Sequence, residues 1–133
     1  MANYLLDTTV IIDCLRGRKE TVDFLTELAS EGSVVGCYAI NIAEVYAGVK
    51  ENERQVTKKL LDSLEYYEVT RNLAELAGEY KREYAGEGIT LSPSDIIIAA
   101  VAISNNLTLV TDNLRHYPIP ELNIKQIEAG SRG

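Results

Sequence analysis

The chain has 133 residues, a formal net charge of −7, and 46% hydrophobic and 25% charged residues. This length fits one domain with a single hydrophobic core, and the composition excludes an intrinsically disordered chain. The negative charge argues against broad electrostatic adhesion to nucleic acid, which needs clustered Lys and Arg, unless several acids share one pocket and bind cations there.

The N-terminal segment MANYLLDTTVIID lacks the features of a signal peptide or a membrane span. No basic region precedes its apolar stretch, and Asp7 interrupts that stretch early. We therefore expect a cytoplasmic protein. Cys14 and Cys37 have no CxxC spacing, so we expect both to be reduced, partly buried packing residues.

The first part of the chain alternates short apolar runs with amphipathic helical patterns. In chain order the sequence predicts a strand over 4–6, a helix that includes 10–12, a helix over 22–29, a strand over 34–40 and a helix that begins at Asn41. The first acid of the chain, Asp7, therefore stands at the carboxyl end of the first strand.

The second part of the chain continues the alternation. It predicts helices over 56–64 and 73–84, a possible strand over 66–69, an apolar helix over 92–106, and strands over 107–111 and 122–127. Strands that alternate with helices of this length imply an α/β fold, with a parallel sheet of about five strands covered by helices on both faces.

Four acids differ from the rest because they stand at strand ends or helix beginnings. They are Asp7, Glu44, Asp95 and Asp112. In an open parallel sheet the carboxyl ends of all strands lie at one edge, so acids from remote segments can meet there. Carboxylates that meet repel one another unless a cation bridges them, and all-oxygen ligand sets favour Mg²⁺ or Mn²⁺ over zinc.

Each acid also has a purely structural interpretation. Residues 92–95 form a capping box with proline at the first helical position, and residues 41–44 have similar cap spacing. Asp7 fits a helix cap, and residues 112–113 fit a turn. Capping alone, however, does not explain acids at all four places, because Ser, Thr and Asn cap equally well.

Three segments carry a further pattern: YLLDTTVIID, INIAEVYAGV and LSPSDIIIAAVAISNNLTLVTDN. They resemble the four motifs of the PIN-domain family and, within it, the VapC-type toxins of toxin-antitoxin systems. The resemblance runs from Tyr4 to about Ile127. It implies one PIN-like domain over residues 1–129, followed by a frayed tail over residues 130–133.

The resemblance also implies a Mg²⁺- or Mn²⁺-dependent ribonuclease. Asp7 and Asp95 would hold the principal ion, Glu44 would ligate it or orient a water, and Thr9 would position Asp7 or a water. The fourth catalytic and metal-binding position is open between Asp112 and Asn113, because many relatives carry the ligand two residues after the threonine that matches Thr111.

Relatives of this kind cleave RNA, are inhibited by a cognate VapB-type antitoxin and commonly form homodimers. The candidate RNA contacts are Arg16, Arg18, Arg115 and His116. Solvated loop charge is an equal explanation for the arginines, and His116 could instead pack in a turn or act as a general base. Candidate partner surfaces, for which core packing is an equal explanation, contain Tyr46, Val49, Leu60, Leu64, Tyr66 and Tyr67.

Two other classes of function stay open. An α/β phosphatase or phospho-acceptor domain would also place an acid after the first strand, but Asp7-Thr8-Thr9 lacks the second acid of an Asp-x-Asp motif, and Lys125 is poorly placed to contact a phosphate. A non-catalytic RNA- or protein-binding PIN-like module is favoured if Asn113 disables the metal site.

Overall fold

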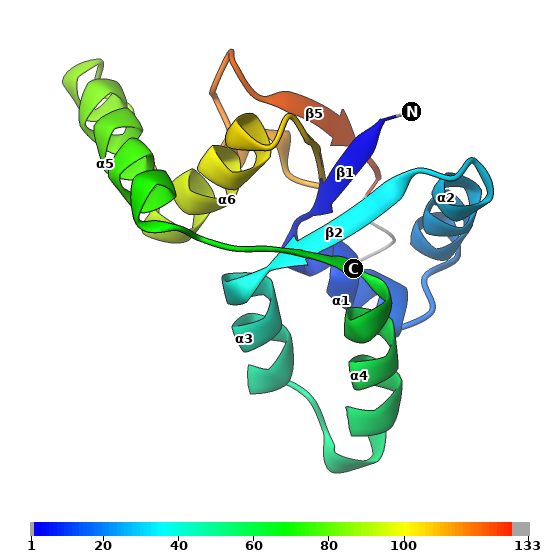
Figure 1. Cartoon of the computed structure of the whole chain (residues 1–133). Coiled ribbons are helices and arrows are strands. Elements are labelled where there is room, and N and C mark those ends of the chain that lie inside the picture. Colours follow the sequence, from blue (N-terminus) through cyan, green and yellow to red (C-terminus); the bar gives the residue numbers. More distant parts are fainter. Residues whose placement is uncertain (1, 129–133) are drawn as a thin grey trace.

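The computed structural model describes residues 2–128 and is an α/β fold with one five-stranded sheet (Figure 1). The strands are β1 (Asn3–Leu6), β2 (Val34–Tyr38), β3 (Glu65–Tyr67), β4 (Thr108–Thr111) and β5 (Asn123–Gln126). The helices are α1 (Thr8–Leu15), α2 (Lys19–Ser30), α3 (Ala39–Ala47), α4 (Arg54–Ser63), α5 (Arg71–Gly86) and α6 (Pro93–Ser104), with 3₁₀ turns η1 (Glu51–Glu53) and η2 (Leu114–His116). The predicted fold class is confirmed.

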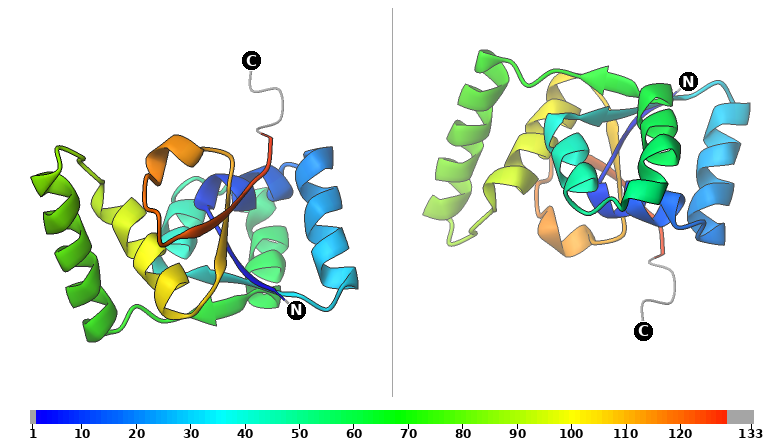
Figure 2. Two further views of the ribbon diagram at one scale, coloured as in Figure 1. Left: turned by 90° about the horizontal axis from the view of Figure 1, so that it is seen from above. Right: turned by 90° about the horizontal axis from the view of Figure 1, so that it is seen from below.

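Alternating strand residues divide the interior into two cores, one on each face of the sheet. Leu5 and Leu109 pack with α5 and α6, whereas Leu6 and Val110 pack with α1 and with side chains from α2, α3 and α4. Figure 2 shows α5 and α6 on one side of the sheet and α2 and α4 on the other. Burial on both faces explains why these strands are almost continuously apolar.

The strand order places β1 beside β4 at the centre of the sheet. All neighbouring strands are parallel, in the order β3-β2-β1-β4-β5. The chain builds outward from β1 to β3 and then returns to the other side of β1, so the strand order reverses between β1 and β4. Ligand crevices of open α/β sheets form outside the carboxyl ends of strands at such a reversal. Asp7 follows β1 at this point, and Asp112 follows β4.

Two helix beginnings behave as the sequence predicts. The Asp7 side chain caps α1 by accepting from Thr8 N at 2.8 Å, and Ser92 Oγ caps α6 by accepting from Asp95 N at 3.2 Å. Pro93 occupies the first turn of α6, where a missing N–H costs nothing. These caps fix the directions in which Asp7 and Asp95 leave the backbone.

Two predicted strands each end two residues earlier in the structure. The strand predicted over 34–40 ends at Tyr38, and α3 begins at Ala39 rather than at Asn41. The buried Asn41 side chain lies inside the first turn of α3 and accepts from Tyr38 N at 3.0 Å, so it caps the helix from within. The strand predicted over 66–69 is instead Glu65–Tyr67, which pairs with β2.

The remaining expectations concern the cysteines, the membrane and the tail. Cys14 and Cys37 are both free, and burial raises the pKa of Cys37 to about 11, as expected for a packing residue.

Within residues 2–128, none of the helices has the length and apolar character needed to span a bilayer. The predicted tail over residues 130–133 lies outside the described residues.

Candidate active site

One pocket at the carboxyl edge of the sheet contains all four acids that the sequence singled out. Asp7, Glu44, Asp95 and Asp112 line a cavity of about 380 Å³ beside the β1–β4 reversal. The other lining residues are Thr8, Thr9, Ile12, Tyr38, Ser94, Ile98, Asn113, His116 and Tyr117. The segments that meet here are more than 100 positions apart in the sequence, as the Thr111–Asp7 hydrogen bond shows.

Asp7 is the most strongly held of the four acids. Its Oδ2 accepts from Thr111 Oγ1 at 2.8 Å and from Tyr117 OH at 3.0 Å, and its Oδ1 accepts from Thr8 N at 2.8 Å. Burial raises the pKa of Asp7 above its ordinary value, the three hydrogen bonds oppose that shift, and the charge of Asp95 adds to it. Asp7 therefore has a fixed orientation, and its buried environment disfavours the ionised carboxylate.

Asp95 faces Asp7 from the first turn of α6 and has a histidine beside it. His116 Nδ1 lies 3.8 Å from Asp95 Oδ2, and Asn113 Nδ2 lies 3.0 Å from His116 Nε2. If the Asn113 amide donates to Nε2, then the neutral ring carries its proton on Nδ1 and presents it to Asp95. His116 thus lines the acid pocket, while 56% of its side chain is exposed.

Glu44 is held by a short chain of polar side chains that starts in the core. Asn41 Nδ2 donates to Thr8 Oγ1 at 2.9 Å, and Thr8 Oγ1 donates to Glu44 Oε1 at 2.7 Å. Asn41 is fully buried whereas Glu44 is exposed. This chain connects α3 to α1 and fixes a carboxylate at the rim of the pocket.

The fourth position contains two residues with different partners. Asp112 Oδ1 accepts from Thr9 Oγ1 at 3.1 Å, while the Asn113 amide pairs with His116. Thr9 therefore contacts Asp112, and its role in positioning Asp7 or a water stays a prediction. The donors to Asp7 come from the Thr8 backbone, Thr111 and Tyr117.

Two buried tyrosines complete the pocket, and sequence reasoning did not identify either. Burial raises the pKa of Tyr117, and the charges of Asp7 and Asp95 raise it further, so its hydroxyl stays protonated and donates to Asp7. Burial and the charge of Glu44 raise the pKa of Tyr38 in the same way, and its hydroxyl donates to the Ser94 carbonyl at 3.2 Å. The sequence signal was weak, because Tyr38 lies inside the strand predicted over 34–40 and Tyr117 follows the strand predicted over 107–111 by six residues. Tyrosine is also common in apolar cores.

The donor set of the pocket fits a hard divalent ion that retains water. In residues 2–128 we find no group of three or more His, Cys, Asp or Glu side chains that could hold a metal ion. Mg²⁺ does not require such a group, because it keeps several waters and usually binds one or two carboxylates together with substrate phosphates. Asp7 and Asp95 provide a pair of carboxylates, and burial, with a smaller contribution from the charge of Asp95, raises the pKa of Asp7.

The candidate RNA contacts do not share one location. Arg18 Nε forms an ion pair with the buried Asp13 at 3.0 Å, and its contact with RNA stays a prediction. Arg115 is exposed on η2, outside the pocket lining. His116 lines the acid pocket, and Arg16 lines a neighbouring groove.

Most residues of the candidate partner surfaces contribute to packing. Tyr46, Leu60 and Leu64 pack partly against the core that contains α1, and Tyr67 packs against the core that contains α5 and α6. Tyr66, with 42% of its surface exposed, is the most accessible residue of this set.

Comparison with known proteins gives one consistent result. Residues 4–122 match the model of the PIN domain family. The chain is 32% identical over 119 residues to ribonuclease VapC19 of Mycobacterium tuberculosis, a match that covers 89% of this chain and 95% of that protein.

Solved structures agree with the sequence match. The crystal structure of VapBC2 from Rickettsia felis bound to a promoter DNA fragment contains a chain that superposes with a TM-score of 0.82 at 25% identity, covering 95% of this chain and 99% of that one. A toxin-antitoxin complex from Klebsiella pneumoniae contains a chain that superposes with a TM-score of 0.75 at 27% identity, covering 95% of this chain and 99% of that one. The chain therefore belongs to the PIN domain family.

Proposed function

We propose that this chain is a metal-dependent endoribonuclease that hydrolyses phosphodiester bonds in RNA and acts as the toxin of a VapBC-type toxin-antitoxin pair, inhibiting translation. The observation that carries the proposal is the meeting of Asp7, Glu44, Asp95 and Asp112 in one pocket of a PIN domain. A relative that is 32% identical over most of its length is named a ribonuclease.

The proposed cofactor is Mg²⁺ or Mn²⁺, with Asp7 and Asp95 as its principal ligands. Glu44 and Asp112 complete the carboxylate set from the rim and from the end of β4. A divalent ion bound here supplies a water of lowered pKa and stabilises negative charge on the transferring phosphate.

The side chains of the chain perform the remaining tasks. Thr111 and Tyr117 hold Asp7 in one orientation, and the Asn41–Thr8 link holds Glu44. The carboxylates can accept the proton that a water loses as its oxygen forms a bond to phosphorus and the bond to the leaving ribose oxygen breaks. The first turn of α6 adds the partial positive charge of a helix N-terminus near the phosphate.

The proposed partners follow from the solved relatives. The Rickettsia felis structure is named VapBC2, and the Klebsiella pneumoniae structure is named a toxin-antitoxin complex. We infer that this chain binds a cognate VapB-type antitoxin, that it forms a homodimer, and that it acts on RNA in the cytoplasm.

The structure favours the nuclease over the phosphatase alternative. Thr9, two residues after Asp7, donates to Asp112, so the loop after β1 holds one acid and no Asp-x-Asp pair. Lys125 is exposed on β5 and does not line the acid pocket. A non-catalytic binding module differs from the nuclease in its response to metal, which the following experiment measures.

The test compares the wild-type chain with Asp95→Asn and with the matched control Asp23→Asn. Asp23 is exposed, lies on α2 and pairs with Lys19, so its loss leaves the pocket intact. Each protein is incubated with total RNA plus Mg²⁺ or Mn²⁺, and new RNA ends are mapped. We expect cleavage by the wild type and by Asp23→Asn, no cleavage by Asp95→Asn, and complete inhibition by EDTA.

Two results would contradict the proposal. Equal cleavage by Asp95→Asn would remove this residue from the mechanism. No cleavage by the wild type with either ion, together with no metal binding in calorimetry, would favour the non-catalytic module.

A further inference from the structure

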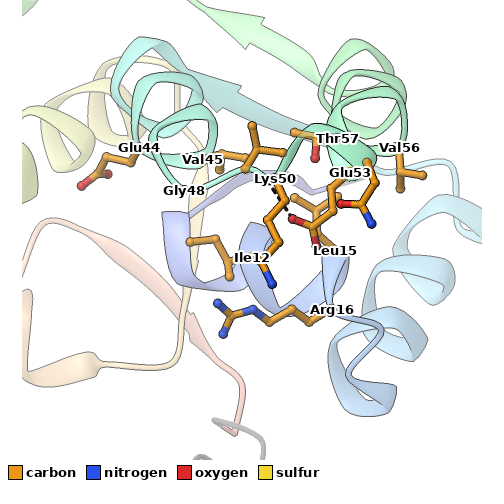
Figure 3. Close-up of a pocket in the computed structure, with 12 residues that line it drawn as sticks. Ile12, Leu15, Arg16, Glu44, Val45, Gly48, Lys50, Glu53, Val56 and Thr57 are labelled. Atoms are coloured by element: carbon orange, nitrogen blue, oxygen red, sulfur yellow. Dashed lines mark hydrogen bonds between the residues drawn. The ribbon is translucent and has the colours of Figure 1, made fainter.

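A second cavity opens directly beside the acid pocket. This groove has a volume of about 340 Å³ and lies between α1, α3 and α4 (Figure 3). Ile12 and Glu44 line both the groove and the acid pocket, so the two cavities share a wall. A ligand that passes through the acid pocket can therefore continue into the groove.

Two cations, Arg16 and Lys50, line this groove. Arg16 follows the last residue of α1, and Lys50 precedes η1. Within the described part of the chain neither forms an ion pair, although two carboxylates line the same groove. Figure 3 shows both side chains extending over α1 with their charged ends in the same region of the groove.

The carboxylates that line the groove have other partners. Glu53 Oε1 accepts from the Lys50 backbone N at 3.0 Å, and Glu44 Oε1 accepts from Thr8 Oγ1 at 2.7 Å. Both acids are thus held by neutral donors, and the Lys50 ammonium and Arg16 guanidinium remain available to an external anion. In a chain with a net charge of −7, such a pair is a local exception to the overall charge.

Part of the groove floor is aliphatic. Ile12, Leu15, Val45 and Val56 contribute to it, and none of the lining residues in the described part of the chain is aromatic. An unpaired nucleobase can lie against such a floor while its phosphate faces the cations, and proteins commonly recognise RNA through unpaired nucleotides. A charged rim above an apolar floor suits a single strand better than a duplex, whose bases are stacked inside.

We propose that this groove is a subsite for single-stranded RNA, in which Arg16 and Lys50 bind backbone phosphates next to the phosphodiester held in the acid pocket. The proposal rests on the ribonuclease function and specifies how the substrate reaches the carboxylates. It assigns Lys50 a role that sequence reasoning did not give it, and it gives Arg16 a defined partner.

The test measures RNA binding without cleavage. A fluorescein-labelled, single-stranded RNA oligonucleotide is titrated with protein in EDTA over a range of KCl concentrations. Neutralising one phosphate of a single strand contributes a slope of about −0.7 to log K against log salt. We expect Arg16→Gln and Lys50→Gln each to reduce the magnitude of the slope by about 0.7, and the double variant by about 1.4.

The same relation gives the expected affinities. Each single variant should bind RNA roughly fivefold more weakly at 0.1 M salt, and the double variant roughly 25-fold more weakly. Lys59→Gln and Lys125→Gln are the matched controls, because both lysines are exposed and lie outside the groove. The controls should match the wild type in slope and affinity.

Equal slopes for the wild type and the double variant would overturn the proposal. Unchanged RNA binding combined with lost binding of a purified cognate antitoxin would assign the groove to a protein partner and overturn it as well. The proposed function can fail independently of this proposal. If the chain binds RNA through Arg16 and Lys50 but does not cleave it with Mg²⁺ or Mn²⁺, the groove remains an RNA subsite and the nuclease function is contradicted.

Discussion

The acid pocket and the adjoining groove share Ile12 and Glu44 but treat charge in opposite ways. In the pocket, the neutral donors Thr111 and Tyr117 hold the Asp7 carboxylate. In the groove, the acids accept from neutral donors, and the cations Arg16 and Lys50 have no ion pairs among the described residues. The two proposals therefore assign catalysis to the pocket and binding of the RNA backbone to the groove, and the net charge of −7 does not indicate the cations of the groove.

Among the variants that test this comparison, Asp7→Asn should have the largest effect, which is on the rate of cleavage. The change keeps the shape of the side chain but removes a charge from the pocket, so we expect kcat to fall on the order of 10²- to 10³-fold. The salt dependence of RNA binding should stay as in the wild type, since Arg16 and Lys50 are untouched. Steady-state cleavage kinetics and anisotropy measure the two effects, and a change in KM alone would break the separation.

Tyr117→Phe tests whether the neutral donors matter to the pocket. The variant removes the hydroxyl that donates to Asp7 Oδ2 and keeps the buried ring. Loss of a group that orients a metal ligand typically costs about 10- to 100-fold in metal affinity or activity. Mn²⁺ titration followed by electron paramagnetic resonance should show the loss, whereas wild-type affinity would indicate that Thr111 and Thr8 hold Asp7 without Tyr117.

Thr8→Val acts on Glu44, one of the two residues that line both cavities. It breaks the Asn41–Thr8–Glu44 chain, so Glu44 loses its anchor and the buried Asn41 amide loses a partner. We expect kcat/KM to fall about tenfold and the free energy of unfolding to fall by about 1–3 kcal/mol. Urea denaturation measures the second effect, and Thr8→Ser, which keeps the hydroxyl, should restore both.

The smallest expected effect is on stability as a function of pH. The folded-state pKa of Asp7 is raised above its ordinary value of 3.8, mainly by burial. Its ionised form is therefore destabilising in the metal-free protein, and the penalty develops as the pH rises from 3.8 through the folded-state pKa. Asp7→Asn should thus melt at a higher temperature than the wild type at pH 7, by a few degrees at most.

This difference should disappear in acid. Below the unfolded pKa, wild-type Asp7 is protonated in both the folded and unfolded states, so the melting temperatures of the two proteins should converge. A stabilisation that is constant with pH would show that the effect comes from packing rather than from charge.

The sequence was sufficient to predict where the four acids lie, because the topology of a parallel sheet determines which segment ends share an edge. Asp7, Glu44, Asp95 and Asp112 follow this rule. The caps at Asp7 and Ser92 were predictable as well, since capping depends on residues within one turn of the helix.

The groups that hold the acids in place were not predictable from local patterns. Tyr117 follows the 3₁₀ turn η2 and reaches Asp7 across 110 positions of sequence, and Asn41 acts from inside α3 rather than from its cap. The ion pair between Arg18 and the buried Asp13 was not predictable either. Such contacts depend on how loops pack, which periodicity does not encode.

The central claim is that Asp7 and Asp95 share a divalent ion. Crystals of the wild-type chain soaked in Mn²⁺ and measured near the manganese absorption edge test it directly, with Asp95→Asn crystals as the comparison. The account predicts an anomalous peak between the two carboxylates in the wild type and a lost or much weaker peak in the variant. A pocket without a peak, or an equal peak in both proteins, would contradict it.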